Sequence, residues 1–202
     1  MKIFYAVLLI VMSYLYGSVP FALVIGKLFF HKDVRNYGSG NLGGTNAGRV
    51  LGKPAGLAVI ILDATKCIVA MGITKLCIIH LGVHPDIYYI SGLACIIGHC
   101  YPIFAGFKGG KGVSSAIAYA LMTNIYAFLI AFVTFLVVLK LSKYVSLSSM
   151  LGCIAVCIAS PFLGESLACI ITNLIITCLV IYKHAANIQR IKAGNENKIS
   201  WM

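Results

Sequence analysis

The chain is short of charge, and above all of negative charge. Only 10% of its 202 residues are charged, and 5 Asp and Glu stand against 16 Lys and Arg, for a formal net charge of +11. A soluble globular domain carries about 25% charged residues, whereas 60% of this sequence is hydrophobic. The composition therefore excludes an ordinary soluble domain and predicts a polytopic membrane protein whose apolar surface faces lipid.

Several chemical motifs are missing as well. There is no Gly-x-Ser-x-Gly elbow and no Gly-x-x-x-x-Gly-Lys-[Ser/Thr] loop, which excludes an α/β-hydrolase nucleophile and a nucleotide P-loop. None of the eight cysteines forms a Cys-x-x-Cys pair, and all lie in or beside apolar runs, so we interpret them as small apolar residues. The five histidines are scattered and the carboxylates do not cluster, so we expect neither a metal nor a cofactor.

The apolar runs predict the fold. A helix needs about 20 apolar residues to cross a bilayer, and the candidate runs are 3–25, 55–76, 87–104, 113–139, 147–163 and 167–182. The run 113–139 is interrupted by Met122, Thr123 and Asn124, which predicts two short helices joined by a turn. We therefore expect an all-α membrane bundle of about seven transmembrane helices, in a single domain over residues 1–202.

The basic residues predict the orientation of these helices. Most of the 16 Lys and Arg lie in four polar segments, 26–54, 105–112, 140–146 and 183–202, while the loop 80–86 has none. The positive-inside rule places the four basic segments in the cytoplasm, with the N-terminus outside and the C-terminus inside. Basic residues in short loops between apolar runs suit anionic headgroups or anionic substrates, so membrane lipids, and no nucleic acid, are the expected partners.

Two glycine-rich strings predict an anion site. The first runs from Gly38 to Arg49 and the second from Gly98 to Gly112, and both are expected to be loops. Glycine lets the backbone approach an anion and direct N–H groups at it, while Lys and Arg add positive charge. The second string also leads to the start of a predicted helix, which attracts anions. The candidate phosphate-binding residues are Gly38, Ser39, Gly40, Asn41, Thr45, Asn46 and Arg49 in the first string, and His99, Lys108, Gly109, Gly110 and Lys111 in the second.

Two polar groups follow near the end of the chain. Ser146 opens a serine-rich string whose hydroxyls either cap a helix or bind a ligand. His184 and Asn187 are three residues apart, so we expect them to share one helix face where the chain leaves the membrane. Glu196 is the only carboxylate of the tail.

One pair of charges lies inside an apolar run. Asp63 and Lys66 are three residues apart, and an isolated charge in a membrane is costly. We therefore expect an ion pair that faces the interior of the bundle, and both a structural and a site-lining role stay open for it.

Taken in order, the motifs resemble one family. The chain carries GSVP at 17–20, GSGNLGGTNAGR at 38–49, GHCYPIFAGFKGGKGV at 98–113, VSLSS at 145–149 and HAANI…GNE at 184–196. This series resembles the bacterial acyl-phosphate-dependent glycerol-3-phosphate acyltransferases over nearly the whole chain. The sequence departs from the family pattern at Leu42-Gly43-Gly44, where Pro and Ala are common, and at Cys67, where Gly is common, but no polar group is lost.

The resemblance implies a function and a site. It implies a multi-pass enzyme of the bacterial inner membrane, with its active site facing the cytoplasm, in phospholipid synthesis. The enzyme would move a fatty acyl group from acyl phosphate to the sn-1 hydroxyl of glycerol 3-phosphate, giving 1-acylglycerol 3-phosphate, or lysophosphatidic acid. The residues that match the family's active site by motif position are Ser39, Arg49, Lys108, Ser146, His184, Asn187 and Glu196.

The residues are consistent with a direct mechanism. Acyl phosphate is a mixed anhydride with a good leaving group, so the glycerol hydroxyl can attack the acyl carbon without a protein nucleophile. We expect Arg49, Lys108 and Asn187 to hold the phosphate groups and backbone N–H groups to stabilise the developing oxyanion. The proton acceptor stays open between His184 and a phosphate oxygen of the substrate, and we favour the phosphate.

Two other classes of protein are weighed against the enzyme. A transporter for a phosphorylated metabolite would also use several helices and anion-binding loops, but alternating access needs a site near the midplane, whereas these motifs are expected on one side. A lipid-binding scaffold would not need so many placed polar groups. The sequence leaves open the preferred acyl chain length and the oligomeric state.

Overall fold

The computed structural model describes residues 1–199, and the regular structure of these residues is entirely helical. The α-helices are α1 (Lys2–Gly17), α2 (Phe21–Phe30), α3 (Gly44–Leu51), α4 (Lys53–Leu81), α5 (Ile87–Cys100), α6 (Val113–Thr123), α7 (Ile125–Ser142), α8 (Val145–Ala159), α9 (Leu167–Lys183) and α10 (Ala185–Lys192). Three short 3₁₀ helices are η1 (Val34–Asn36), η2 (Ile103–Ala105) and η3 (Ser160–Leu163). The predicted all-α class is confirmed.

The chain forms two compact units, Met1–Ala118 and Tyr119–Met202, and the boundary falls inside α6. The first unit contains both glycine-rich strings. The second contains the serine-rich string and the C-terminal motif. The single domain expected over residues 1–202 stays a prediction.

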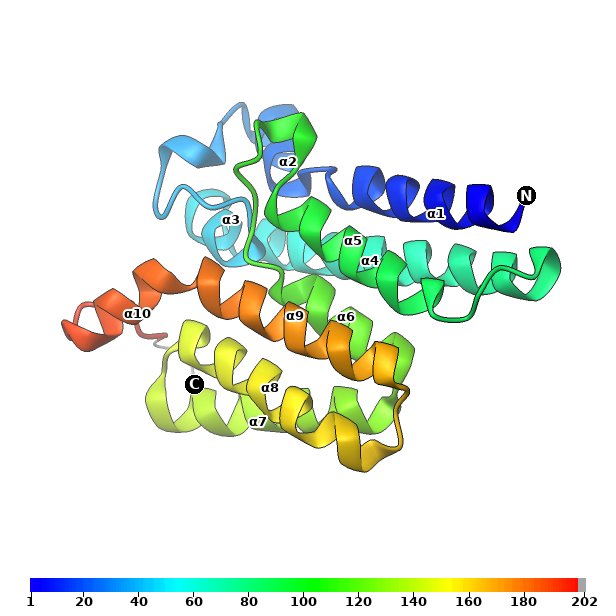
Figure 1. The fold of residues 1–202 in the computed structure, drawn as a ribbon. Helices are drawn as coiled ribbons and strands as arrows, with labels where there is room; N and C mark the ends of the chain where they lie inside the picture. The colour runs from blue at the N-terminus through cyan, green and yellow to red at the C-terminus, as the bar shows by residue number, and fades with distance from the viewer. Residues whose placement is uncertain (200–202) are drawn as a thin grey trace. The chain divides into compact units, whose positions relative to one another are not determined.

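In the first unit α1, α4 and α5 lie side by side (Figure 1). Glycine permits the closest of these approaches, because a Cβ on Gly17 would overlap the backbone of Cys95 and a Cβ on Gly98 would overlap the backbone carbonyl of Tyr14. Small residues bring helix backbones together in membranes, where packing rather than water drives association. The short helix α3 packs on α4 next to this group.

The first apolar run, predicted as a span over residues 3–25, is long enough to be one but is broken into two helices. Helix α1 ends at Gly17, α2 begins at Phe21, and the residues between them include Pro20. Proline lacks an N–H donor and clashes with a preceding turn, so it starts a helix more readily than it continues one. The break leaves backbone carbonyl groups without helical partners, and a buried lysine occupies this position, as described below.

The second unit packs α7 on α8 and α8 on α9. The predicted break in the run 113–139 is confirmed: α6 ends at Thr123, and the side chain of Asn124 caps α7 by accepting a hydrogen bond from the N–H of Tyr126 at 2.9 Å. The two helices are unequal, with 11 residues in α6 and 18 in α7, rather than two similar short helices.

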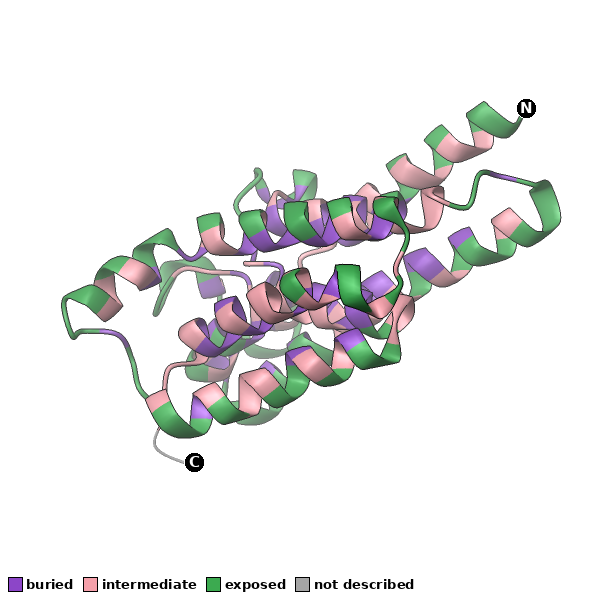
Figure 2. Ribbon diagram, turned by 60° about the horizontal axis from the view of Figure 1, so that its bottom comes forward, coloured by how far each residue is buried: buried purple, intermediate pink, exposed green. Residues whose placement is uncertain are grey.

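Five helical segments within the described residues are long and apolar enough to cross a membrane, and six if the bent pair α9 and α10 is one span. The break between α1 and α2 does not remove Lys2–Phe30 from this set, whereas α6 is shorter. Along these helices the exposed positions, green in Figure 2, carry many large apolar side chains, such as Phe4 and Val133. The protein is therefore a multi-pass membrane protein, while the count of seven and the orientation stay predictions.

Candidate active site

The first glycine-rich string is half loop and half helix, which corrects the expectation of a loop throughout. Gly38 and Gly40 adopt φ of +62° and +66°, a region that L-residues with a Cβ rarely enter. Helix α3 then begins at Gly44 and carries Thr45, Asn46 and Arg49. Thr45 and Arg49 are exposed, so both can meet a ligand.

Asn46 holds this loop in shape. Its side chain is buried, its Oδ1 accepts from the N–H of Ser39 at 2.9 Å, and its Nδ2 donates to the carbonyl groups of Val34 and Tyr37 at 3.1 and 3.2 Å. The amide is thus engaged with the backbone of the loop, which fixes Ser39 at the surface. That Asn46 also binds a phosphate stays a prediction.

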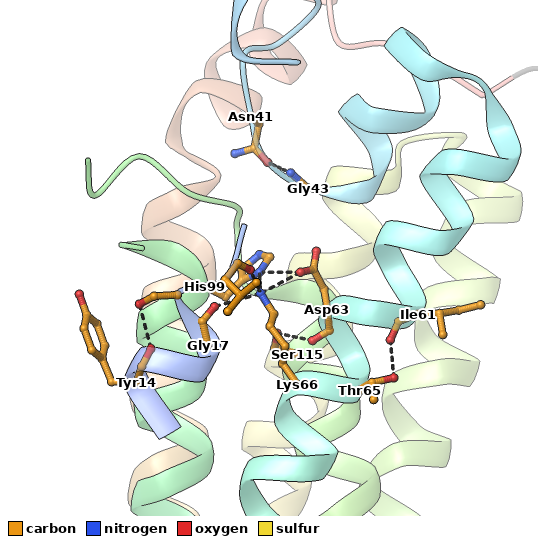
Figure 3. Close-up of polar contacts among 12 residues, drawn as sticks. Tyr14, Gly17, Asn41, Gly43, Ile61, Asp63, Thr65, Lys66, His99 and Ser115 are labelled. Atoms are coloured by element: carbon orange, nitrogen blue, oxygen red, sulfur yellow. Dashed lines mark hydrogen bonds and ion pairs between the residues drawn. The ribbon is translucent and has the colours of Figure 1, made fainter. Parts of the chain in front are cut away.

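Asn41 joins the two glycine-rich strings. Its Nδ2 donates to the carbonyl of Gly109 at 3.1 Å, and its Oδ1 accepts from the N–H of Gly43 at 2.9 Å, the bond drawn in Figure 3. Residues 68 positions apart in the sequence are therefore in direct contact. The structure brings together the two strings that the sequence marked separately.

The second string folds back on itself, so that Gly110 lies against His99. The N–H of Gly110 donates to the carbonyl of His99 at 3.0 Å, and a Cβ on Gly110 would overlap the imidazole. Gly109 and Gly110 are buried, whereas Lys108 is exposed and Lys111 is half-buried. Both lysines directly precede α6, which begins at Val113, so the string leads to the start of a helix as expected.

The cations of the first unit differ in how far they are engaged. Arg35 binds Asp33 through two hydrogen bonds of 2.9 and 2.6 Å, and these bonds lower the pKa of Asp33 to about 2. Arg49 and Lys108 have no carboxylate partner among residues 1–199. The exposed cations that remain for an anionic ligand at the two strings are therefore Arg49 and Lys108.

A second cluster surrounds Glu196 in the other unit. Glu196 Oε1 accepts from Ser146 Oγ and from Asn187 Nδ2, each at 2.6 Å, and Oε2 accepts from Arg190 Nε at 2.7 Å. Burial by itself raises the pKa of Glu196, but these three hydrogen bonds more than offset it, so the pKa lies below its ordinary value. The carboxylate therefore stays ionised and acts as an acceptor.

The structure excludes one alternative left open for this cluster and corrects one expectation. Ser146 does not cap α8, because its hydroxyl donates to Glu196 and the N-cap residue is Tyr144. His184 ends α9, whereas Asn187 lies in α10 beyond a bend of 56°, so the two do not share a face of one helix. Sequence reasoning also missed Arg190; its three-residue spacing from Asn187 in a short helix was the available signal.

His184 has a fixed tautomer. The side chain is buried, and its Nδ1 lies 2.7 Å from the carbonyl oxygen of Val180. Because a carbonyl only accepts, Nδ1 carries the proton and donates it, which leaves the lone pair of the neutral ring on Nε2. The ring is thus oriented by α9.

The low pKa of Glu196 predicts acid sensitivity. A carboxyl group whose pKa is depressed by folding contributes stability above its unfolded value, near 4.5, and loses it as the pH falls through the folded value. We expect the thermal midpoint of the wild type to fall steeply below that pH. Glu196→Gln should have a lower midpoint than the wild type at neutral pH, but its midpoint should fall less on acidification. Thermal unfolding in detergent from neutral to acid pH measures this, and parallel curves would contradict it.

The predicted site residues thus fall into two groups. The structure gathers Ser39, Asn41, Arg49 and Lys108 at the strings of the first unit, and Ser146, Asn187 and Glu196 around one carboxylate in the second. His184 lies three residues before Asn187. Each group combines cations or amides with placed hydroxyls, the donor set that phosphate oxygens require.

The comparisons with known proteins were made on the whole chain. The family model described as "Glycerol-3-phosphate acyltransferase" matches residues 7–194. The glycerol-3-phosphate acyltransferase of Listeria monocytogenes serotype 4a is 46% identical over 196 residues, 97% of this chain and 98% of its own length. Glycerol-3-phosphate acyltransferase 2 of Bacillus anthracis is 44% identical over 194 residues, 96% of this chain and 98% of its own length.

Solved structures match nearly the whole chain as well. The crystal structure of PlsY (YgiH), an integral membrane glycerol 3-phosphate acyltransferase, in its glycerol 3-phosphate form is similar with a TM-score of 0.89 and 35% identity, covering 97% of this chain and 96% of that chain. The lysophosphatidic acid form gives a TM-score of 0.86 and 33% identity over the same shares.

Proposed function

Because the chain belongs to the glycerol-3-phosphate acyltransferase family, we propose that it transfers a fatty acyl group from acyl phosphate to the sn-1 hydroxyl of glycerol 3-phosphate. The products are lysophosphatidic acid and inorganic phosphate. One observation supports this most strongly: Arg49 and Lys108 lie exposed on two glycine-rich strings that Asn41 joins, and neither has a carboxylate partner among the described residues.

The first group of residues suits phosphate binding. Arg49 offers a planar fork of donors, which matches two phosphate oxygens at once, and Lys108 offers a point charge. Ser39 is exposed in the same string as Arg49, with its backbone N–H already bound to Asn46 and its hydroxyl available to a ligand. These three residues would bind and orient a substrate phosphate.

The second group would bind through Ser146 and Asn187, and Glu196 would set their positions. Both oxygens of Glu196 accept hydrogen bonds, and its pKa is lowered, so it is a poor proton acceptor. We assign it a positioning role, in which it orders the Ser146 hydroxyl and the Asn187 amide. Arg190 neutralises its charge and completes the arrangement.

The reaction needs no covalent enzyme intermediate. The sn-1 hydroxyl oxygen attacks the acyl carbon, a new ester C–O bond forms, and the bond between the acyl carbon and the phosphate oxygen breaks. The phosphate leaves with the electron pair of that bond. The hydroxyl proton passes either to a phosphate oxygen or to Nε2 of His184, and donors around the acyl oxygen stabilise the oxyanion.

Substitution of His184 tests the path of the proton. We expect His184→Gln to keep most of kcat, because a phosphate oxygen within the substrates can accept the proton and glutamine can still donate to the Val180 carbonyl. Single-turnover and steady-state rates measure this. A loss near a thousandfold would assign the proton to His184, since general base catalysis contributes about 10²–10⁴-fold.

The location of the enzyme belongs to the same proposal. The four basic segments support an orientation with both glycine-rich strings and the C-terminal motif on the cytoplasmic side. We therefore place the protein in the bacterial inner membrane, with soluble glycerol 3-phosphate arriving from the cytoplasm and the acyl donor from the bilayer. The variants Lys108→Cys and Lys198→Cys, each in a chain without other cysteines, test whether these two positions face the cytoplasm. The measurement is their labelling by an impermeant maleimide in sealed spheroplasts.

The identity of the acyl donor decides the function. Purified protein in liposomes should form lysophosphatidic acid from glycerol 3-phosphate and palmitoyl phosphate, and should form none from palmitoyl-CoA or palmitoyl carrier protein. Product from a thioester alone would overturn the proposed donor. No product with any donor, together with uptake of labelled glycerol 3-phosphate into the liposomes, would favour a transporter instead.

A further inference from the structure

The mechanism above leaves one buried polar cluster unexplained. Asp63 and Lys66 on α4 are each 1% exposed, and His99 at the end of α5 is also buried. Lys66 Nζ lies 2.9 Å from Asp63 Oδ1, and His99 Nδ1 lies 3.4 Å from the same oxygen. Figure 3 shows the three side chains converging between α4, α5 and the end of α1. The expected ion pair is thus found, with a third member.

Lys66 uses its remaining donors on the break between α1 and α2. Its Nζ donates to the carbonyl groups of Gly17 and Val19, both at 2.9 Å. An ammonium group has three N–H bonds, so Asp63 and these two carbonyl groups engage all of them. Lys66 therefore takes the place of the helical donors that the chain loses between Gly17 and Phe21.

The saturation of Lys66 determines what His99 does. Nδ1 of His99 lies 3.4 Å from both Lys66 Nζ and Asp63 Oδ1. Because the three Nζ–H groups of Lys66 are directed at oxygen atoms, we assign Nδ1 as a donor to Asp63 Oδ1. The opposite edge of the ring, at Nε2, then lies against Gly110, where a Cβ would overlap it. The imidazole is thus a fixed support beneath the second glycine-rich string.

Backbone carbonyl groups of the same cluster bind the string and the helix that follows it. Within the string, the N–H of Gly110 donates to the His99 carbonyl at 3.0 Å. After it, the hydroxyl of Ser115 in the first turn of α6 donates to the Asp63 carbonyl at 2.9 Å. The exposed Lys108 lies two residues before Gly110, next to Gly109, which accepts from Asn41.

Stability alone is a weak reason for such a cluster. Asp63 Oδ2 is buried without a hydrogen-bond partner among the described residues, and a buried, incompletely paired carboxylate costs free energy that an apolar pair would avoid. Directed side-chain contacts to the end of α1 and to α5 are what an apolar pair could not supply. The geometry therefore favours a role in positioning.

From these contacts we infer that Asp63, Lys66 and His99 form a positioning network that fixes the string 108–112, and through it Lys108, for the phosphate of a substrate. This inference rests on the proposed function for the identity of that substrate. The network itself touches no reacting atom. It acts by holding the backbone around Lys108 in the conformation that binds phosphate before the substrate arrives.

Asp63→Asn tests the network with almost no change of volume. It removes the charge that holds Lys66 and His99, so the string loses its support while α4 keeps its packing. We expect KM for glycerol 3-phosphate to rise roughly tenfold or more with kcat changed less than about threefold, the pattern of lost ground-state binding. In a Lys108→Ala background Asp63→Asn should add almost nothing, because the network acts through that lysine. Equal effects in the two backgrounds would overturn the inference.

A matched control lies on the same helix. Thr74 is buried in α4, and its hydroxyl bonds only to the Ala70 carbonyl of its own helix. Thr74→Val should leave KM and kcat close to wild type. A rise in KM with Thr74→Val as large as with Asp63→Asn would show that any buried polar change in α4 has this effect, and would overturn the inference.

Limited proteolysis measures local opening of the string 108–112 and does not depend on enzyme activity. Native digestion with a lysine-specific protease should cut after Lys108 or Lys111 roughly tenfold faster in Asp63→Asn than in the wild type, because the protease needs a locally opened chain. Cleavage at Lys192 in the second unit is the internal reference and should not change. A rise at both places would mean general destabilisation and would overturn the inference. If the wild type forms no product with any donor but the selective rise is seen, the proposed function fails and the network stands.

Discussion

Arg49→Ala should lower kcat/KM for glycerol 3-phosphate roughly a thousandfold, since a single placed donor on developing or bound anionic charge is worth about 10²–10³ in rate. Arg49 is exposed on the last turn of α3 and has no carboxylate partner among residues 1–199. Its guanidinium therefore offers its donors to a ligand. Steady-state assays with palmitoyl phosphate as donor measure the effect.

The control for this prediction is a second arginine in the same unit. Arg35 is also exposed, but both of its bonds go to Asp33, and an exposed ion pair contributes about 0–1 kcal/mol to stability. Arg35→Gln should therefore leave kcat/KM near wild type. Arg49→Lys should recover only part of the activity, because an ammonium cannot replace a planar fork. Wild-type activity in Arg49→Ala would remove Arg49 from the phosphate site.

The sequence predicted the helices better than their ends and breaks. Apolar runs locate α4, α5, α8 and α9, because only a helix satisfies its own backbone in lipid. The break at Asn124 was visible because a polar cap residue interrupts a hydrophobic run. The break between α1 and α2 was not visible, because most residues around Pro20 are themselves apolar. The carbonyl groups freed there are bound by Lys66, 47 and 49 residues away in the sequence.

The candidate site was predictable as a set of residues but not as a set of roles. Glycines, cations and amides close together in the sequence indicate an anion site, but they do not show which of these side chains contacts the anion. Only the contacts show that Asn46 is engaged with the backbone of its own loop and that Glu196 collects three donors. Such roles depend on partners far apart in the sequence, which the spacing of neighbouring residues does not predict.

A change at Gly98 should have the largest effect on stability. A Cβ on Gly98 would overlap the Tyr14 carbonyl of α1, and this contact is with rigid backbone, so no side chain can move aside to relieve it. Gly98→Leu should destabilise the protein by about 3 kcal/mol or more, at or above the upper end of what overpacking costs. That loss would lower the thermal midpoint by roughly 6–12 °C. Thermal unfolding in detergent, followed by size-exclusion chromatography, measures it.

The matched control is Gly72 on α4, where a Cβ would meet nothing within 4 Å. Gly72→Leu should keep the wild-type midpoint or raise it, since leucine favours a helix over glycine by about 0.8–1.0 kcal/mol or slightly less. Equal losses in the two variants would refute the close approach of α1 and α5.

Because His99 follows Gly98 directly, Gly98→Leu should also displace the support of the second string. The milder Gly98→Ala should therefore raise KM for glycerol 3-phosphate even where the protein still folds, which would link helix packing in the membrane to phosphate binding at its surface.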